Sequence, residues 1–262
     1  MNSICFDLKG KIAVVTGGSR GIGAATSIRL AEAGADIAIV HRGGANPLGL
    51  EKMIRQLGVK VMSLNSTDVN NAAGVKKAVK AIIAEFEHID ILVNNAGIYK
   101  HSMPEETSER EWDEVIGTNL RGAFLMSREV GRAMIQFGRG GKIVNVASIN
   151  AFLPESDFVH YDASKAGLIG MTRSLALSWG KHGITVNAVA PGLVDTGSLW
   201  STARDRAVAF EKSAPMHQVL EPDDVANVIL FLCSAFASRI TGQTIVVDSG
   251  VSLAGYMTRV WS

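Results

Sequence analysis

The sequence predicts an α/β protein built on a doubly wound, seven-stranded parallel sheet with helices on both faces. Short runs rich in β-branched residues alternate with longer helical patterns along nearly the whole chain. These runs are continuously apolar, which is typical of parallel strands buried on both faces. No repeat, low-complexity tract or linker divides the 262 residues. We therefore expect residues 1–262 to form a single domain.

The first strand and helix form a βα unit. The run "KIAVVTG" at residues 11–17 predicts a strand, and "GIGAATSIRLAEAG" at residues 21–34 predicts a helix that ends at its C-terminal glycine. The apolar run "DIAIV" at residues 36–40 predicts the second strand, and a helix is expected around residues 48–57.

The same alternation predicts the remaining elements. Further strands are expected at "KVMSLN", "IDILVNNAG", "GKIVNVAS", "ITVNAVAPG" and "TIVVDSG", which are residues 60–65, 89–97, 141–148, 184–192 and 244–250. Further helices are expected over residues 71–86, 109–137 and 157–180, and from near Pro222. Ligands in such sheets bind at the carboxyl ends of the strands. Residues 193–220 are too many for a plain connection, so we expect a substrate lid there with a helix or two of its own.

The charge balance argues against several classes of partner. Lys and Arg number 26 against 25 Asp and Glu, a formal net charge of +1, so no overall field attracts nucleic acid or an anionic membrane. The two cysteines, Cys5 and Cys233, suggest neither a disulfide framework nor a metal site. The chain shows no signal-peptide pattern and no run long enough to cross a bilayer. We expect a cytoplasmic protein with a small-molecule ligand and no metal.

A glycine-rich turn, "VTGGSRGIGAAT", connects the first predicted strand to the first helix. Gly17, Gly21 and Gly23 allow a sharp turn and a close approach to a pyrophosphate, which the helix N-terminus can hold through free N–H groups. No Lys-Ser/Thr pair follows, so this is not an ATP-type phosphate loop. A tight turn that binds nothing is the alternative, but three glycines at this junction favour a dinucleotide site.

The end of the second strand discriminates between the two nicotinamide dinucleotides. An acidic residue there would bind the ribose 2′-hydroxyl of NAD and repel a 2′-phosphate. The sequence has "VHRGG" instead, with His41 and Arg42 at that point and Arg20 in the glycine turn. Two guanidinium groups can hold a phosphate, so NADP(H) is the preferred cofactor and NAD(H) the alternative. Arg42 could also be a solvated loop residue.

The stretch "HYDASKAGL" at residues 160–168 places Tyr161 and Lys165 on the same face of a predicted helix. An ammonium near a phenol favours the phenolate and would lower the phenol pKa from its ordinary value of about 10. On its own, such a pair is more often a packed ring and a solvated charge.

The motifs, in their order along the chain, resemble the short-chain dehydrogenase/reductase family. They are "TGGSRGIG", "DV" at Asp68 and Val69, "NNAG", "GTNLRG", "NVAS", "YDASK" and "APGLVDT". The resemblance covers the chain from "DLKGKIAVVTG" to "VVDSG" and implies a Rossmann-like fold. Some stretches look most like sugar-acid dehydrogenases, and others look equally like 3-oxoacyl-carrier-protein reductases.

The resemblance implies four catalytic residues. Tyr161 would exchange a proton with the substrate oxygen, while Lys165 would lower the pKa of Tyr161 and bind the nicotinamide ribose. Ser148 would hold the carbonyl or alkoxide oxygen. Asn119 falls within a predicted helix between two glycines that permit a kink, and it would hold a water that passes protons to Lys165.

The resemblance also implies the residues that bind the nucleotide and, more loosely, the substrate. The nucleotide residues are Gly17, Ser19, Arg20, Gly21, Ile22, Gly23, His41, Arg42, Asp68, Val69, Asn95, Ala96, Gly97, Tyr161, Lys165, Pro191, Gly192, Val194 and Thr196. The substrate residues are Ser148, Asn150, Phe152, Phe158 and Trp200, some of which could instead pack the lid. For Thr196 the alternative is a helix N-cap, and for "NNAG" a turn at a strand end.

These observations lead to an NADP(H)-dependent oxidoreductase that interconverts a secondary alcohol and a ketone, with sugars or sugar acids as first candidates. The first alternative, a 3-oxoacyl-carrier-protein reductase, calls for a basic patch at the entrance, for which the sparse candidates are Arg139, Lys142, Lys181 and His182. The remote alternative is a non-catalytic dinucleotide-binding scaffold, against which the four catalytic residues argue. By the same resemblance we expect a homotetramer, with the helices of Asn119 and Tyr161 in one interface and the last strand in another.

Overall fold

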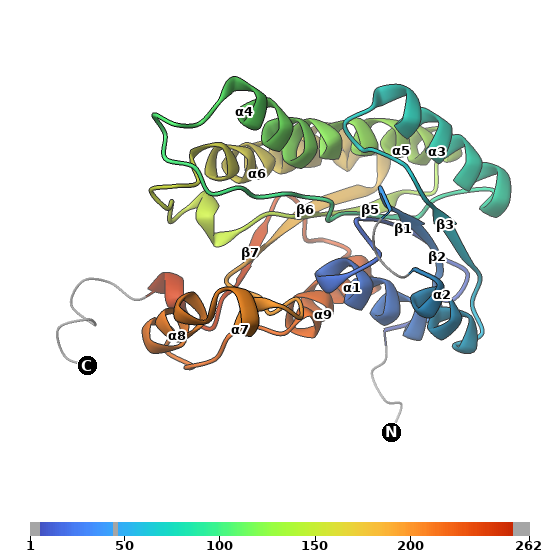
Figure 1. Cartoon of the computed structure of the whole chain (residues 1–262). Helices are drawn as coiled ribbons and strands as arrows, with labels where there is room; N and C mark the ends of the chain where they lie inside the picture. Colours follow the sequence, from blue (N-terminus) through green and yellow to red (C-terminus); the bar gives the residue numbers. More distant parts are fainter. Residues whose placement is uncertain (1–5, 44–46, 254–262) are drawn as a thin grey trace.

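The computed structural model describes residues 6–43 and 47–253, and within them seven parallel strands form one sheet (Figure 1). The strands are β1 (Ile12–Thr16), β2 (Asp36–Val40), β3 (Val61–Leu64), β4 (Ile91–Asn94), β5 (Gly141–Val146), β6 (Ile184–Pro191) and β7 (Thr244–Val247). Their order across the sheet is β3-β2-β1-β4-β5-β6-β7. The predicted fold class, with its seven parallel strands, is confirmed. Cys5 lies outside the described residues.

The helices cover both faces of the sheet. They are α1 (Gly21–Glu32), α2 (Pro47–Gln56), α3 (Ala72–Phe86), α4 (Glu109–Ile116), α5 (Gly122–Phe137), α6 (Val159–Trp179), α7 (Leu199–Thr202), α8 (Arg204–Ser213) and α9 (Pro222–Cys233). Figure 1 shows α3 to α6 on one face, and α1, α2 and α9 on the other. No helix in the described part of the chain is both long enough and apolar enough to cross a membrane.

Two apolar cores, one on each face, hold these layers together. On the α1 side, Ile37 and Ile39 of β2 pack with Leu30 of α1 and Ile229 of α9, all of them buried. On the α5 side, Leu92 of β4 belongs to a second cluster that includes residues of α3, α5 and α6. Burial of strands on both sides explains why they read as continuous apolar runs rather than alternating ones.

The strand order reverses next to β1, and this reversal positions the site. Strand β1 pairs with β2 on one side and with β4 on the other, with Thr16 opposite Val40 and Asn94. After β1 the chain continues to β2 on one side, and after β4 it continues to β5 on the other side, so the two connections diverge from adjacent strand ends. A crevice forms at such a point, and ligands of doubly wound sheets bind there.

The segment predicted as a lid begins and ends at adjacent backbones. Val194 and Leu220 form a parallel bridge, in which Asp195 N donates to Leu220 O at 2.8 Å and Leu220 N donates to Leu193 O at 3.0 Å. Between them the chain forms α7 and α8, as expected of a segment with its own helices (Figure 1).

Candidate active site

The glycine turn after β1 is packed so closely that Gly17 and Gly23 leave no room for a Cβ atom. A Cβ on Gly23 would lie 2.2 Å from the carbonyl oxygen of Gly17, and one on Gly17 would lie 2.9 Å from the Cα of Ala96. Gly17 and Gly21 also adopt positive φ angles of 62° and 52°, which favour glycine. Helix α1 starts at Gly21 without a side-chain cap, so its first N–H groups can donate hydrogen bonds to an anion.

Asn95 ties the end of β4 to this turn. Its Nδ2 donates to the carbonyl oxygens of Thr16 at 3.0 Å and Gly17 at 3.1 Å, and its backbone N–H donates to the Thr16 hydroxyl. The "NNAG" motif and the glycine turn therefore form one rigid unit. Thr196, at the base of the lid, meets the same turn, because a Cβ on Gly21 would lie 3.0 Å from its Cγ2.

A π-helical turn, Gly117–Arg121, separates α4 from α5 and contains Asn119. This turn is the kink expected in the predicted long helix, and such single turns are frequent at functional sites. The Asn119 side chain is buried, accepts from Ile98 N at 2.8 Å and donates to Ile98 O at 2.9 Å. It also donates to the Ser164 hydroxyl at 3.1 Å. The amide thus connects the segment that follows "NNAG" with helix α6.

Lys165 is buried and points to the end of β5. Its Nζ donates a hydrogen bond to the carbonyl oxygen of Val146 at 2.7 Å. A Cβ on Gly97 would lie 3.6 Å from this Nζ and 3.4 Å from Asn119 Oδ1, so these three residues adjoin. No carboxylate within the described ranges forms an ion pair with Lys165, and burial lowers its pKa to about 8.

Tyr161 has a raised pKa in this structure. Burial raises the pKa of the phenol to about 12, with smaller contributions in the same direction from Asp162, Tyr99 and Glu155, while a hydrogen bond with Ser148 works in the lowering direction. The sequence argument expected Lys165 to lower it. The Lys165 ammonium instead lies 5.5 Å from the centre of the Tyr161 ring and bonds to a carbonyl. In the protein alone, desolvation of the phenolate therefore outweighs the neighbouring positive charge.

Ser148 follows β5 at the carboxyl edge of the sheet. Its hydroxyl donates to Asn150 Oδ1 at 3.1 Å and accepts from Asn150 N at 3.2 Å. Phe158 is buried against Tyr161, with the ring centres 5.7 Å apart. Of the expected substrate residues, Ser148, Asn150 and Phe158 therefore lie on the Tyr161 side of the site. The side chains of Phe152 and Trp200 are exposed instead, and neither ring contacts the ring of Tyr161 in the described part of the chain.

Two arginines lie at the expected nucleotide edge. Arg20 and Arg42 are exposed, and neither guanidinium group forms a hydrogen bond or an ion pair with another described residue. His41 is buried: its Nδ1 accepts from Gly43 N at 3.1 Å, and its Nε2 lies 3.0 Å from the Ser63 hydroxyl. Burial lowers its pKa, so the ring shapes the turn as a neutral group. Val69 packs under α5, where a Cβ on Gly122 would lie 2.6 Å from its Cγ2.

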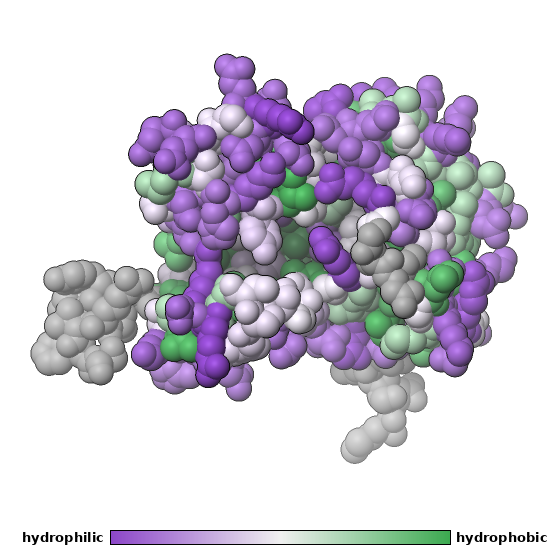
Figure 2. Space-filling model, in the orientation of Figure 1, coloured by the Kyte–Doolittle hydropathy of each residue, from purple (hydrophilic) through white to green (hydrophobic). Residues whose placement is uncertain are grey.

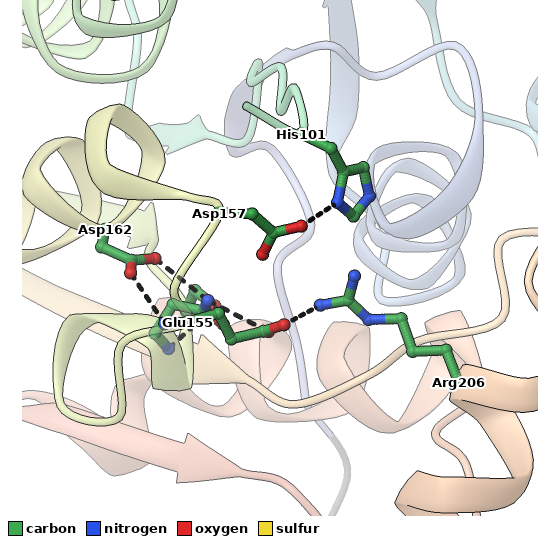
Figure 3. Close-up of polar contacts among 7 residues, drawn as sticks. His101, Glu155, Asp157, Asp162 and Arg206 are labelled. Atoms are coloured by element: carbon green, nitrogen blue, oxygen red, sulfur yellow. Dashed lines mark hydrogen bonds and ion pairs between the residues drawn. The ribbon is translucent and has the colours of Figure 1, made fainter. Parts of the chain in front are cut away.

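Sequence reasoning missed a group of residues around Phe158, which Figure 3 shows. His101 Nδ1 lies 2.8 Å from Asp157 Oδ2, and Arg206 of α8 forms an ion pair with Glu155. We call His101, Glu155, Asp157, Asp162 and Arg206 the entrance cluster. Only Asp162 falls within a recognised motif, so no local signal could have found the others.

Figure 2 shows a hollow at the centre of the face that Figure 1 presents, with hydrophobic residues visible inside and mostly hydrophilic residues on the rim. Two further hollows are shallow. One, of about 470 Å³, adjoins Gly21 and Thr196 at the start of α1. The other, of about 490 Å³, is lined by Trp112 and Val159 and by none of the expected site residues.

The fold and this site define a class of protein, and comparisons with known proteins agree. A family model described as "Enoyl-(Acyl carrier protein) reductase" matches residues 17–252. The chain belongs to the short-chain dehydrogenase/reductase family. It is therefore an oxidoreductase that acts on CH–OH groups, in a family that uses nicotinamide nucleotides.

Three curated relatives illustrate the range of substrates in their names. The chain is 37% identical over 247 residues to 2-dehydro-3-deoxy-D-gluconate 5-dehydrogenase of Escherichia coli (strain K12), covering 94% of this chain and 96% of that one. It is 40% identical over 252 residues to D-threitol dehydrogenase of Mycolicibacterium smegmatis, covering 95% of each. It is 38% identical over 245 residues to 3-oxoacyl-[acyl-carrier-protein] reductase of Aquifex aeolicus, covering 93% and 98%.

A solved structure agrees with the fold. A short-chain type dehydrogenase/reductase from Mycobacterium marinum matches with a TM-score of 0.90 and 32% identity, covering 94% of this chain and 97% of that one.

Proposed function

We propose that this protein is an NADP(H)-dependent enzyme that interconverts a secondary alcohol and a ketone on a sugar or related polyhydroxy compound. The observation that carries the proposal is a continuous run of contacts from the glycine turn to the phenol. Gly97 adjoins Asn119 and Lys165, and Lys165 lies beside Tyr161. Tyr161 in turn shares a hydrogen bond with Ser148.

The nucleotide fits the turn it is assigned to. The close approach of Gly17, Gly23 and Ala96 leaves backbone rather than side chains facing a pyrophosphate, and the uncapped start of α1 offers N–H groups to it. Asn95 fixes the geometry by bonding to both Thr16 and Gly17. Bound there, the nucleotide supplies or accepts the hydride.

Tyr161 and Ser148 handle the substrate oxygen in this proposal. During oxidation, the Tyr161 phenolate takes the proton of the alcohol, while the Ser148 hydroxyl turns away from Asn150 Oδ1 and donates to the oxygen where negative charge develops. The hydrogen bond from Asn150 N still holds the Ser148 oxygen in place. During reduction the same proton returns from Tyr161 to the oxygen.

Lys165 makes the phenolate attainable. Its ammonium has three donors, and the Val146 carbonyl takes one. The remaining two are free to bind the nicotinamide ribose and a water beside Asn119. The phenol pKa of about 12 in the protein alone must fall for catalysis near neutral pH, and the positive charge of an oxidised nicotinamide acts in that direction.

The preference for NADP(H) rests on Arg20 and Arg42. Both guanidinium groups are exposed at the nucleotide edge, and neither is paired with a carboxylate of the described chain. They are therefore free to bind a 2′-phosphate with charge-assisted hydrogen bonds. His41 supports this edge by fixing the turn through Gly43 and Ser63.

The alternative function, a 3-oxoacyl-carrier-protein reductase, calls for basic residues at the site entrance. Arg139, Lys142 and Lys181 adjoin the amino ends of β5 and β6, where Gly141 lies opposite Ile184. The carboxyl ends, where Ser148 and Tyr161 lie, are at the opposite edge of the sheet. Lys142 is also half-buried and donates to the Ala237 carbonyl at 3.3 Å. The sparse candidates for a basic patch therefore lie away from the carboxyl edge, because Arg139 and Lys181 precede the two strands and Lys142 is the second residue of β5.

A turnover assay tests the proposed function. Purified protein is assayed with NADP⁺ and NAD⁺ on sugars, polyols and sugar acids, and with NADPH and NADH on 3-oxoacyl thioesters and simple ketones. We expect NADP⁺-dependent oxidation of at least one polyhydroxy compound. Turnover of acyl thioesters alone would favour the carrier-protein alternative. Nucleotide binding without any turnover would favour a scaffold.

A further inference from the structure

The entrance cluster lies one side chain away from the phenol. Arg206, on lid helix α8, has its guanidinium carbon 5.1 Å from the centre of the Phe158 ring, and that ring lies 5.7 Å from the ring of Tyr161. His101 packs on the same phenyl ring, with ring centres 4.4 Å apart. A substrate bound at Tyr161 under the lid would therefore lie near these charged groups.

Hydrogen bonds also connect the cluster to the serine of the site. Asn150, which holds Ser148, donates from Nδ2 to Asp162 Oδ1 at 3.0 Å and to Glu155 Oε1 at 3.3 Å. Glu155 then forms the ion pair with Arg206 (Figure 3). The carboxylates are consequently fixed in position relative to the reacting oxygen rather than free to turn away.

The cluster carries an excess of negative charge. Glu155, Asp157 and Asp162 face one guanidinium, Arg206, and one imidazole, His101. The sum is negative whether or not the imidazole is protonated. Both Asp162 and Glu155 raise the pKa of Tyr161, which indicates that their field reaches the phenol oxygen. A substrate carboxylate placed here would meet the same repulsion.

The cluster also has the groups that bind hydroxyls. Carboxylate oxygens accept hydrogen bonds from hydroxyl groups, and the guanidinium and imidazole can donate to them. The rings of Tyr99 and Phe158, with centres 6.2 Å apart, give an apolar surface for the C–H side of a carbon chain. Tyr99 is 67% exposed, so its ring remains open to a ligand.

We infer that the entrance cluster selects uncharged polyhydroxy alcohols over the corresponding sugar acids, and that Glu155 and Arg206 set this preference. The inference rests on the proposed function and narrows its substrate class.

Matched substrate pairs provide the test, because a polyol and its aldonic acid differ only in one terminal carbon. The pairs are D-threitol and D-threonate, xylitol and xylonate, and D-glucitol and D-gluconate, each assayed for oxidation with both nucleotides. We expect kcat/KM for the polyol to exceed that for the acid by about tenfold at low salt, and the ratio to shrink at high ionic strength.

Two variants distinguish the effect of charge from the effect of losing the Glu155–Arg206 ion pair, because both break that pair but change the net charge in opposite directions. Glu155→Gln removes a negative charge and frees the guanidinium, so the polyol-to-acid ratio should fall by about fivefold or more. Arg206→Gln leaves the carboxylate uncompensated, so the ratio should rise. Arg132→Gln is the control, because this arginine pairs with Glu129 on α5, away from the entrance cluster.

The outcomes are distinct. Opposite shifts in the two variants support the inference. Equal losses of turnover with an unchanged ratio would mean that the pair only anchors the lid, and a wild-type preference for the acids would also overturn the inference, while both results leave the oxidoreductase intact. Turnover of no member of any pair with either nucleotide would contradict the proposed substrate class and this inference with it.

Discussion

The Lys165 ammonium donates to the carbonyl of Val146, the last residue of β5, at 2.7 Å. This bond holds helix α6 against the carboxyl end of β5. It also directs the ammonium along the Tyr161 ring, 5.5 Å from the ring centre, rather than at its hydroxyl. The position suits a lysine that serves both a nucleotide ribose and the phenol, while burial sets the pKa values of both groups.

The first prediction concerns the phenol oxygen. Tyr161→Phe should lower kcat by about 10²–10⁴-fold, because it removes the only ionisable atom. The phenyl ring keeps its contacts with Phe158 and Tyr99, so nucleotide affinity should remain. Steady-state kinetics and a fluorescence titration with NADPH measure the two effects. Turnover within tenfold of wild type would refute the acid/base role.

The second prediction concerns the stability effect of Lys165. Its folded pKa of about 8 lies below the ordinary 10.5, so the unfolded chain binds more protons between these values. The contribution of Lys165 to the free energy of unfolding therefore rises with pH from 8 to 10.5, and below pH 8 the buried ammonium costs about 3 kcal/mol. Lys165→Met should flatten this rise.

Urea denaturation of the ligand-free protein from pH 7 to 10 measures that slope. Lys80→Met, at an exposed position of α3, is the control and should keep the wild-type slope. The same Lys165→Met variant should lose both turnover and NADPH affinity, since one ammonium serves two partners. Parallel pH curves for wild type and Lys165→Met would contradict the assigned pKa.

The third prediction concerns the glycine turn. Gly23→Ala places a methyl group 2.2 Å from the Gly17 carbonyl oxygen, so the turn must open. We expect NADPH affinity to fall by about tenfold or more and the melting temperature to drop. Gly74→Ala in α3 is the matched control, because its added Cβ makes only an ordinary 3.6 Å contact with Asn71. Equal affinities for the two variants would refute the assignment.

The fourth prediction tests the choice of nucleotide. Arg42→Ala should reduce NADPH affinity by about one to two decades and leave NADH affinity nearly unchanged, because only NADPH carries the 2′-phosphate. Arg139→Ala, exposed at the opposite edge of the sheet, should change neither. The measurement is kcat/KM with each nucleotide at low and moderate salt. A wild-type enzyme that prefers NADH would show that Arg42 does not bind the phosphate.

The fifth prediction is a homotetramer. On α5 and α6, Ala123, Met126 and Leu168 are buried in the chain's own core, but Leu177 is 88% and Phe124 is 42% exposed. Exposed apolar side chains on the two long helices suit a contact with a second copy. Light scattering at micromolar concentration should give a particle of four chains, and Leu177→Glu should lower that number. A monomer in wild type would contradict the prediction.

The strands, most helices and the Tyr161–Lys165 pair could be predicted because their signals are local. Apolar runs mark the strands, and a spacing of four residues places the phenol and the ammonium on one helix face. The kink near Asn119 was also foreseeable from its glycines. Its π-helical form, Gly117–Arg121, was not, because one extra residue in a turn leaves no mark on the apolar pattern.

The entrance cluster could not be predicted, because its pairs join distant segments. Glu155 and Arg206 are 51 residues apart, and His101 and Asp157 are 56 apart. No spacing rule connects such positions before the lid is folded. The raised pKa of Tyr161 in the protein alone could not be predicted for a related reason, because it follows from burial of the phenol, which depends on packing between distant segments.

The bridge between Val194 and Leu220 has a consequence for engineering. Because hydrogen bonds hold the two ends of the lid side by side, the segment between them can be exchanged as a unit. Its closure costs little chain entropy, so a replacement of different length should be tolerated. Replacing residues 198–219 with the corresponding segment from another family member would therefore alter which compound is accepted, while Thr196, which meets the glycine turn, stays in place.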